Sequence, residues 1–337
     1  MLRSGWQAMV LAAGLVFAGA AGAETKLDPR FPVYIKVSGV SGSLKSVGSD
    51  TMNNLMALWA EGFLKMYPNV SIEIEGKGSS TAPVSLIAGT AHFGPMSRDM
   101  KKKEEDDFEK KFGYKPTAMR TSIDMLAVFV HRDNPIGKKG LTLQQVDAIF
   151  SKTRKGGYKE EITTWGQLGL TGEWADKPIG LYGRNSASGT YGFFKEKALF
   201  GGDYKDSVKE QPGSSSVVQG IASDKFAIGY SGIGYRTADV VAVPLAKDAE
   251  SDAVPAEAET VNEYPLHRYL LVYLNARPGT RLDPLRGEFL RYVFSKEGQQ
   301  DVIRDGYLPV SAAVAKQDLA KVGIPMEIKD AKLSKSE

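Results

Sequence analysis

Four short loops of small residues carry the side chains that could bind a charged ligand. They are Gly48-Ser49-Asp50-Thr51, Gly78-Ser79-Ser80-Thr81, Gly94-Pro95-Met96-Ser97-Arg98 and Arg184-Asn185-Ser186-Ala187-Ser188-Gly189-Thr190. Each lies between a segment with the pattern of a strand and one with the pattern of a helix. Glycine lets a backbone approach a ligand closely, and Ser and Thr hydroxyls are short hydrogen-bond donors. In the first, second and fourth loops these donors would stand at a helix N-terminus, where free N–H groups and the helix dipole favour an anion.

Arg184 adds a cation to the fourth loop, directly after the strand-like segment 179–183. Its forked guanidinium matches two oxygens of a tetrahedral oxyanion. One Gly/Ser loop before a helix is usually only a turn with a helix cap. Three such loops together with an arginine predict an oxyanion-binding cleft. No loop contains the Gly-Lys-Ser/Thr of a nucleotide-binding phosphate loop.

The sequence offers little for catalysis. Its three histidines, His92, His131 and His267, are isolated and form no metal-binding pair. There is no G-x-S-x-G nucleophile motif. The chain has no cysteine, which excludes disulfides, thiol nucleophiles and Cys-based zinc or iron–sulfur sites. We therefore expect a binding protein rather than an enzyme, with no metal and no cofactor.

Composition excludes further classes of protein. The 337 residues include 43 Lys+Arg and 40 Asp+Glu, and this formal charge of +3 is too small and too dispersed for a nucleic-acid surface. The hydrophobic fraction of 42% is that of an ordinary globular protein. The length suits two domains or one large one.

Residues 1–23 have the pattern of a secretory signal peptide. Arg3 supplies the positive start, a short apolar run follows, and Ala21-Gly22-Ala23 matches the small-x-small cleavage pattern. The apolar run is too short to span a bilayer, which takes ~20 residues. We expect cleavage after Ala23 and a periplasmic protein, with full secretion as the alternative.

Strand-like and helix-like segments alternate along the rest of the chain. Residues 70–74 alternate apolar and polar side chains, as in a half-buried strand, whereas 125–130 and 270–274 are continuous apolar runs. This alternation predicts an α/β protein with a mostly parallel sheet. If both apolar runs cross between lobes, lobe 1 comprises 24–124 and 265–337, and lobe 2 comprises 125–264.

Three helices can be predicted from local signals. Leu55, Trp59, Phe63 and Met66 recur at helical spacing and form one apolar face. Thr142-Leu143-Gln144-Gln145 has the spacing of a capping box. Asp283-Pro284 places a good N-cap before a proline suited to the first helical turn.

Three stretches carry a resemblance to a known family. VGSDTMNNLMALWAEGFLKMYPNVSIEIEGKGSSTAPVSLIAGTAHFGPMSR, GRNSASGTYGFF and AIGYSGIGY resemble the periplasmic phosphate-binding proteins of bacterial ABC-type phosphate importers. The match runs from about Ser46 to Asn275 and on to Pro309. It implies a type II periplasmic binding protein fold whose two lobes close on one dehydrated phosphate ion in a cleft between them. It also implies delivery of inorganic phosphate to an inner-membrane ABC permease by a monomer.

The resemblance assigns phosphate contacts to the residues that match the family's motifs. Together with Ser49 and Ser97 of the same loops, the expected ligand-binding residues are Ser49, Asp50, Thr51, Ser79, Ser97, Arg184, Ser188, Gly189 and Thr190. Two positions depart from the best-known members. Ser97 replaces an Asp that accepts the hydrogen bond from the proton on phosphate, and Asp50 stands where a Thr is common.

The sequence allows more than one role for Asp50 and more than one function. Asp50 is the only carboxylate in the four loops, so it either accepts the phosphate proton or merely caps the helix that begins near Thr51. The function also has alternatives. One is a secreted phosphatase with a Ser or Thr nucleophile, and the other is the same fold binding sulfate or another tetrahedral oxyanion.

Overall fold

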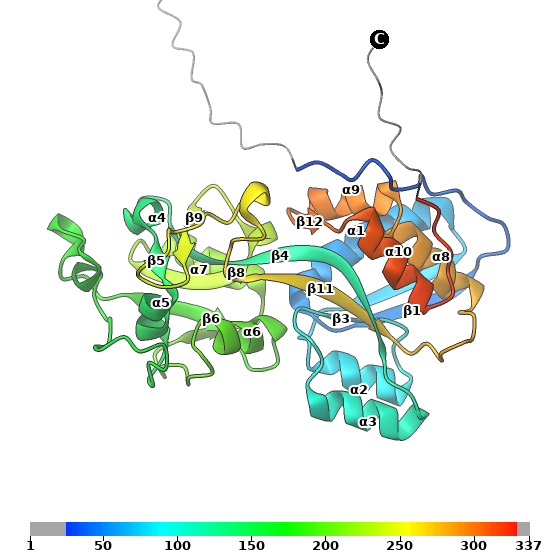
Figure 1. Ribbon diagram of the computed structural model, residues 1–337, viewed down its shortest axis with the longest axis horizontal. Coiled ribbons are helices and arrows are strands. Elements are labelled where there is room, and N and C mark those ends of the chain that lie inside the picture. Colours follow the sequence, from blue (N-terminus) through cyan, green and yellow to red (C-terminus); the bar gives the residue numbers. More distant parts are fainter. Residues whose placement is uncertain (1–24, 329–337) are drawn as a thin grey trace, which may run out of the picture.

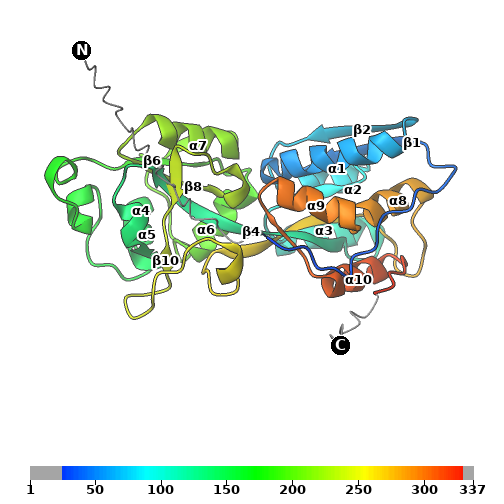
Figure 2. The same ribbon diagram turned by 90° about the horizontal axis from the view of Figure 1, so that it is seen from above.

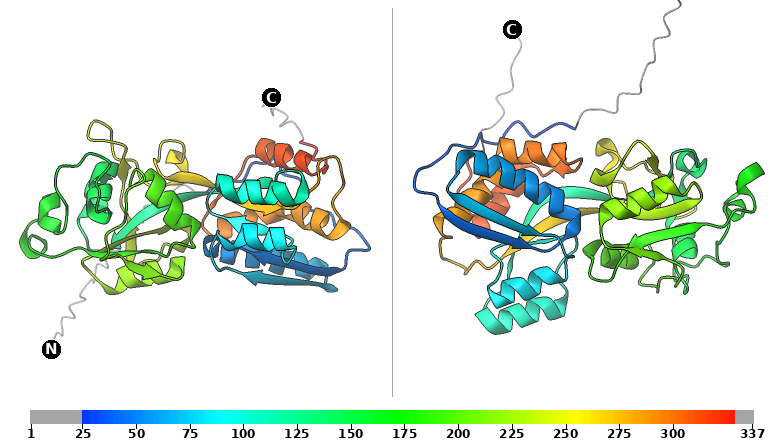
Figure 3. Two further views of the ribbon diagram at one scale, coloured as in Figure 1. Left: turned by 90° about the horizontal axis from the view of Figure 1, so that it is seen from below. Right: turned by 180° about the vertical axis from the view of Figure 1, so that it is seen from behind.

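The structure is a computed structural model that describes residues 25–328. The expected signal peptide therefore lies outside the described residues. Two lobes lie side by side and are joined by two long strands, β4 (Thr117–His131) and β11 (His267–Leu274) (Figure 1). Views from above, below and behind show the same two bodies (Figures 2 and 3). Within residues 25–328, no helix is long and apolar enough to cross a membrane.

Lobe 1 is built from both ends of the described chain. Its elements are β1 (Gly42–Val47), η1 (Asp50–Met52), α1 (Asn53–Met66), β2 (Val70–Glu75), α2 (Thr81–Ala88), β3 (Gly94–Met96), α3 (Lys102–Phe112), α8 (Pro284–Val293), α9 (Lys296–Arg304), β12 (Leu308–Pro309) and α10 (Ala312–Lys321).

Lobe 2 is formed by the middle of the chain. Its elements are α4 (Ile136–Lys139), β5 (Leu141–Thr142), α5 (Leu143–Phe150), η2 (Trp165–Leu168), η3 (Gly172–Trp174), β6 (Gly180–Arg184), α6 (Gly189–Lys197), β7 (Lys209–Gln211), α7 (Ser214–Ser223), β8 (Ala227–Gly232), η4 (Ile233–Tyr235), β9 (Val240–Ala242), β10 (Leu245–Ala246) and η5 (Ala258–Thr260). The predicted lobe boundaries, which fall inside β4 and just before β11, remain a proposal.

One mixed sheet runs through both lobes in the order β3-β11-β4-β8-β6-β7, with β9 and β12 also paired to β4. The prediction of a mostly parallel sheet is wrong at its centre, because β4 pairs antiparallel with β8, β9, β11 and β12. The reason is the chain path: β4 leaves lobe 1 and β11 returns to it, so the two strands run in opposite directions. The pairs β1–β2 and β6–β8 are parallel, as expected.

The local helix signals are confirmed. Thr142 caps α5 in a capping box with Gln145, and the Asp283 side chain accepts a hydrogen bond from the Arg286 backbone N–H at the start of α8. On α1, Trp59 and Phe63 are fully buried, and the Trp59 indole donates to the carbonyl of Gly298. These contacts attach the first helix of lobe 1 to its C-terminal helices.

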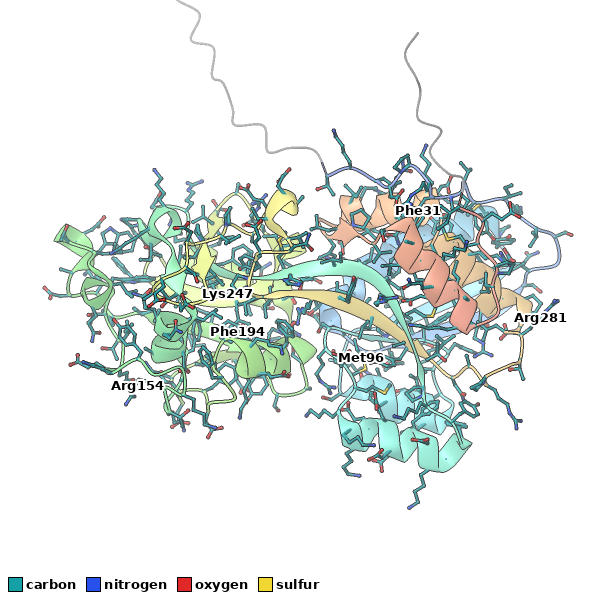
Figure 4. The ribbon with its side chains drawn as sticks, viewed as in Figure 1. Phe31, Met96, Arg154, Phe194, Lys247 and Arg281 are labelled. Atoms are coloured by element: carbon teal, nitrogen blue, oxygen red, sulfur yellow. The ribbon has the colours of Figure 1, made fainter. Side chains whose placement is uncertain are left out.

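Aromatic side chains fill the core of lobe 2 beneath α6. Phe194 stacks on Tyr230 with ring centroids 3.9 Å apart and meets Phe150 edge to face at 5.3 Å. Figure 4 marks Phe194 in lobe 2 and Met96 in lobe 1. Phe194 belongs to α6, which carries Gly189 and Thr190, and Met96 is the last residue of β3, directly before Ser97. Both side chains are fully buried, so these predicted site residues are held by packed cores.

Candidate functional site

Three loops of lobe 1 meet through buried hydroxyl groups. Ser49, after β1, donates from Oγ to Ser97 Oγ at 3.0 Å. Ser97, after β3, donates its backbone N–H to Ser79 Oγ at 3.0 Å, and the two side-chain oxygens are 3.3 Å apart. All three side chains are buried. The predicted serines therefore converge at one point, although they lie up to 48 residues apart in the sequence.

The N-terminus of α6 brings lobe 2 against this point. Thr51 Oγ1 and Thr190 Oγ1 are 2.8 Å apart in a hydrogen bond between the lobes. Gly189 lies so close to lobe 1 that an added Cβ would overlap Ser79 Oγ and would stand 2.6 Å from Ser97 Oγ. The lobes are thus in contact through the predicted residues. We call Ser49, Thr51, Ser79, Ser97 and Thr190 the hydroxyl cluster.

The α6 N-terminus forms because Ser188 caps it. The Ser188 Oγ accepts hydrogen bonds from the backbone N–H groups of Thr190 at 3.1 Å and Tyr191 at 3.4 Å. Its extended backbone (φ −71°, ψ 135°) is typical of an N-cap. The Ser188 hydroxyl therefore serves its own helix in this structure, while the helix points its positive end at the hydroxyl cluster.

Arg184 lies next to the cluster, at the end of β6. Its side chain is 1% exposed, and its Nη1 donates to Ser214 Oγ at 2.7 Å. The same Nη1 lies 3.3 Å from Asp50 Oδ2. Among the described residues, the buried Nε has no hydrogen-bond partner. Burial lowers the pKa of Arg184, and the Asp50 carboxylate opposes that shift.

Asp50 does not cap the helix that it begins, so that alternative is wrong. Ser49 is the N-cap of η1 and makes no side-chain cap bond. The Asp50 carboxylate instead accepts the backbone N–H of Ser214 at 2.8 Å, at the start of α7 in lobe 2. We call Asp50, Arg184 and Ser214 the arginine group. Whether Asp50 accepts a proton from a ligand stays a prediction.

Two tyrosines hold the backbone of the first loop. Tyr235 of lobe 2 donates from its hydroxyl to the carbonyl of Asp50 at 3.0 Å. Tyr307 of lobe 1 donates to the carbonyl of Thr51 at 2.8 Å. Burial raises the pKa of both phenols, which keeps them protonated as donors. The loop is therefore fixed from both lobes.

Sequence reasoning missed a buried ion pair beside the hydroxyl cluster. Arg268 on β11 donates from Nε and Nη2 to Asp124 Oδ2 on β4, at 3.0 and 2.8 Å. Arg268 also donates to the Ser97 carbonyl at 2.7 Å and to Thr190 Oγ1 at 3.0 Å. The signal that could have found this pair was a single charged residue beside each apolar strand run.

The segment Pro212-Gly213-Ser214 was also missed, although it has the same small-residue pattern before a helix as the predicted loops. It supplies Ser214 and the Pro212 carbonyl, which accepts from Arg184 Nη2 at 3.2 Å. The structure therefore brings all nine predicted residues into one region. Of these nine residues, Ser188 uses its hydroxyl to cap α6.

The site is suited to holding an anion. Its polar atoms are mainly hydroxyls, helix N-terminal amides and two guanidinium groups, which donate hydrogen bonds to negative oxygens. Over residues 25–328, no three His, Asp or Glu side chains are grouped to hold a metal ion.

Comparisons with known proteins agree with this geometry. The family model described as the PBP superfamily domain matches residues 36–297. The phosphate-binding protein PstS of Pseudomonas aeruginosa strain PAO1 is 56% identical over 308 residues, which cover 91% of this chain and 95% of that protein. The phosphate-binding protein PstS of Bacillus subtilis strain 168 is 28% identical and covers 80% of this chain and 82% of its own length.

A solved structure gives the same result. The X-ray structure of a phosphate ABC transporter substrate-binding protein with bound phosphate, from Clostridium perfringens, superposes with a TM-score of 0.67 and 27% identity. The match covers 80% of this chain and 100% of that one. The resemblance seen in the sequence and the two-lobed fold that it implied are therefore confirmed. The chain belongs to the PBP superfamily, as a member of the phosphate-binding protein family with the type II two-lobed fold.

Proposed function

We propose that this protein binds one inorganic phosphate ion between its lobes and delivers it to an ABC-type phosphate import permease. The observation that carries the proposal is the meeting of the lobe 1 hydroxyls with the α6 N-terminus of lobe 2, beside the buried Arg184. A dehydrated dianion needs many donors at once, and these elements supply them. The named function of the Pseudomonas aeruginosa relative supports the same ligand.

The proposed phosphate site consists of the nine predicted residues. Thr51, Ser79, Ser97 and Thr190 would donate from hydroxyls, Gly189 from its backbone, and Arg184 from its guanidinium. Asp50 would accept the proton that hydrogen phosphate carries, and Ser49 and Ser188 would hold the loop and helix in place.

A phosphatase has less support. Among the described residues, the hydroxyls of the hydroxyl cluster bond to each other, to the Ser97 backbone N–H and to Arg268, and none bonds to a histidine or carboxylate that could act as its base. The relatives described above are named as binding proteins. A phosphatase assay of the purified protein with a chromogenic phosphomonoester, with and without chelator, should show no turnover.

Isothermal calorimetry of the ligand-stripped protein with phosphate, sulfate and arsenate tests the function. We expect strong binding of phosphate and arsenate and much weaker binding of sulfate. At a hundredfold excess over Kd, phosphate should stabilise the protein by ~2.7 kcal/mol. A protein that shows neither heat nor a melting shift with millimolar phosphate would exclude the function, and preferential sulfate binding would assign the other oxyanion.

We also propose a cellular location, an oligomeric state and a partner for this protein. Export with cleavage after Ala23 would yield a mature chain that begins at Glu24, located in the periplasm. Mass spectrometry of the protein from a periplasmic extract tests the cleavage site. Light scattering after size exclusion tests the proposed monomer, and cross-linking to the inner-membrane permease tests the partner.

A further inference from the structure

The Arg268–Asp124 ion pair joins the two strands that connect the lobes. Arg268 on β11 lies directly opposite Asp124 on β4 in the antiparallel register. Both side chains are buried, Asp124 completely. Burying two charges has a desolvation penalty, and a buried ion pair therefore often adds little to stability. This pair is a candidate for another role.

The pair also contacts both sides of the site. From lobe 1, the Ser97 carbonyl accepts from Arg268 Nη1, and from lobe 2, Thr190 Oγ1 accepts from Nη2. Asp124 Oδ1 in turn accepts the backbone N–H of Ile233 in lobe 2 at 3.0 Å. The guanidinium of Arg268 therefore links the connecting strands to hydroxyl-cluster residues of both lobes. An arrangement that moves Ser97 away from Thr190 must break at least one of these bonds.

The bond from Arg268 occupies one of the two acceptor positions of the Thr190 hydroxyl oxygen. A threonine hydroxyl has one proton, and its oxygen accepts here from Arg268. The proton of Thr190 is thus left to be donated, to Thr51 or to an anion. The ring of Phe193 packs against the guanidinium at 5.1 Å and limits its rotation. Because Asp124 balances the charge of Arg268, the contribution of Arg268 to the site is orientation more than charge.

We propose that Arg268 is a positioning residue of the anion site: it makes the Thr190 hydroxyl a donor to the bound anion, and it does so only when the lobes are together. This inference rests on the proposed phosphate function. It implies that the connecting strands contribute to ligand affinity in addition to the binding loops.

A double-mutant cycle on the full protein tests the proposal. Arg268→Gln is combined with Asp124→Asn, so that no buried charge is left unpaired, and phosphate affinity is measured with Thr190 intact and with Thr190→Val. We expect the paired change to weaken phosphate binding about tenfold with Thr190 intact, and by less than about threefold once Thr190→Val has removed the hydroxyl. If the paired variant does not fold by circular dichroism, Arg268→Lys takes its place under the same criterion.

A matched ion pair between β4 and α10 provides the control. Arg120 bonds Asp318 through two side-chain contacts, away from the binding loops. Arg120→Gln with Asp318→Asn should leave phosphate affinity within about twofold of wild type. Equal losses with and without the Thr190 hydroxyl, no loss at all, or the same loss in the control pair would overturn the positioning role. A wild-type protein that binds no phosphate would instead overturn the proposed function, and this inference with it.

Discussion

Asp50 and Ser214 face each other across the two lobes, with the Ser214 backbone N–H donating to Asp50 Oδ2 at 2.8 Å. Ser214 begins α7, so the carboxylate lies at the positive end of a lobe 2 helix. The guanidinium of Arg184 is 3.3 Å from the same oxygen. Asp50 is therefore a contact between the lobes as well as the only carboxylate of the four predicted loops.

Replacing Asp50 by asparagine separates these two roles. Asp50→Asn keeps an oxygen for the Ser214 N–H but loses the charge opposite Arg184. A carboxylate accepts the proton of hydrogen phosphate and repels sulfate, which has none. We expect phosphate affinity to fall about tenfold and the phosphate-to-sulfate ratio to narrow. Titration of both anions measures this, and exposed Asp206→Asn is the control. An unchanged phosphate-to-sulfate affinity ratio would mean that another group accepts the phosphate proton.

Arg184 is predicted to be the main cationic ligand. Its buried Nε lacks a hydrogen-bond partner among the described residues, so a donor is left for an anion. Hydrogen bonds to charged groups contribute about 1.5–3 kcal/mol each, so Arg184→Ala should weaken phosphate binding by tenfold or more. Arg184→Lys should restore only part, because an ammonium cannot fork. Calorimetry of both decides, with Arg132→Ala, an exposed lobe 2 arginine, as the reference. Wild-type affinity in Arg184→Ala would rule out this role.

Gly189 is predicted to be essential for closure rather than for folding. A Cβ there would overlap Ser79 and stand 2.6 Å from Ser97 Oγ, both in the other lobe. In the same helix, a Cβ at Gly192 would meet only the Arg98 side chain, at an ordinary 3.5 Å from Cδ and 3.9 Å from Nε. Alanine favours helix over glycine by about 1 kcal/mol, so neither variant should lower the melting temperature of the ligand-free protein.

We therefore expect Gly189→Ala to reduce phosphate affinity more than about tenfold and Gly192→Ala to leave it unchanged. Calorimetry and ligand-free melting curves of the two variants test this. Equal affinities would mean that the lobes do not close as tightly with ligand as they do in this structure.

The parts of the protein that local sequence determines could be predicted. Local sequence, over a few residues, determines the apolar face of α1, the capping box of α5 and the small-residue loops. The direction of β4 against β11 could not, because it follows from where the chain returns after lobe 2. The Arg268–Asp124 pair was missed for the same reason, since its partners are 144 residues apart. Asp50 was predicted to belong to the site, but its partner Ser214 lies in the other lobe and no local pattern connects them.

Asp305 carries a carboxyl at the end of α9, beside the contact between the lobes. Its backbone approaches Gly234 of lobe 2, and Asp124, Tyr235 and Tyr307 lie in the same region. Its buried Oδ2 has no hydrogen-bond partner among the described residues. Burial, and then the charge of Asp124, raise the pKa of Asp305 from the ordinary 3.8 to about 7.

This shift makes stability depend on pH. Between about pH 4 and 7 the folded chain holds a proton at Asp305 that the unfolded chain has lost, so the free energy of unfolding falls as pH rises through this window. Asp305→Asn cannot ionise and escapes that loss. We expect it to be more stable than wild type by at least about 1 kcal/mol at pH 8, and to show no such advantage near pH 4. Denaturant unfolding of both proteins at the two pH values measures the difference, with exposed Asp206→Asn giving the background. If Asp305→Asn is more stable than wild type by the same amount at both pH values, folding does not raise the pKa of the Asp305 carboxyl.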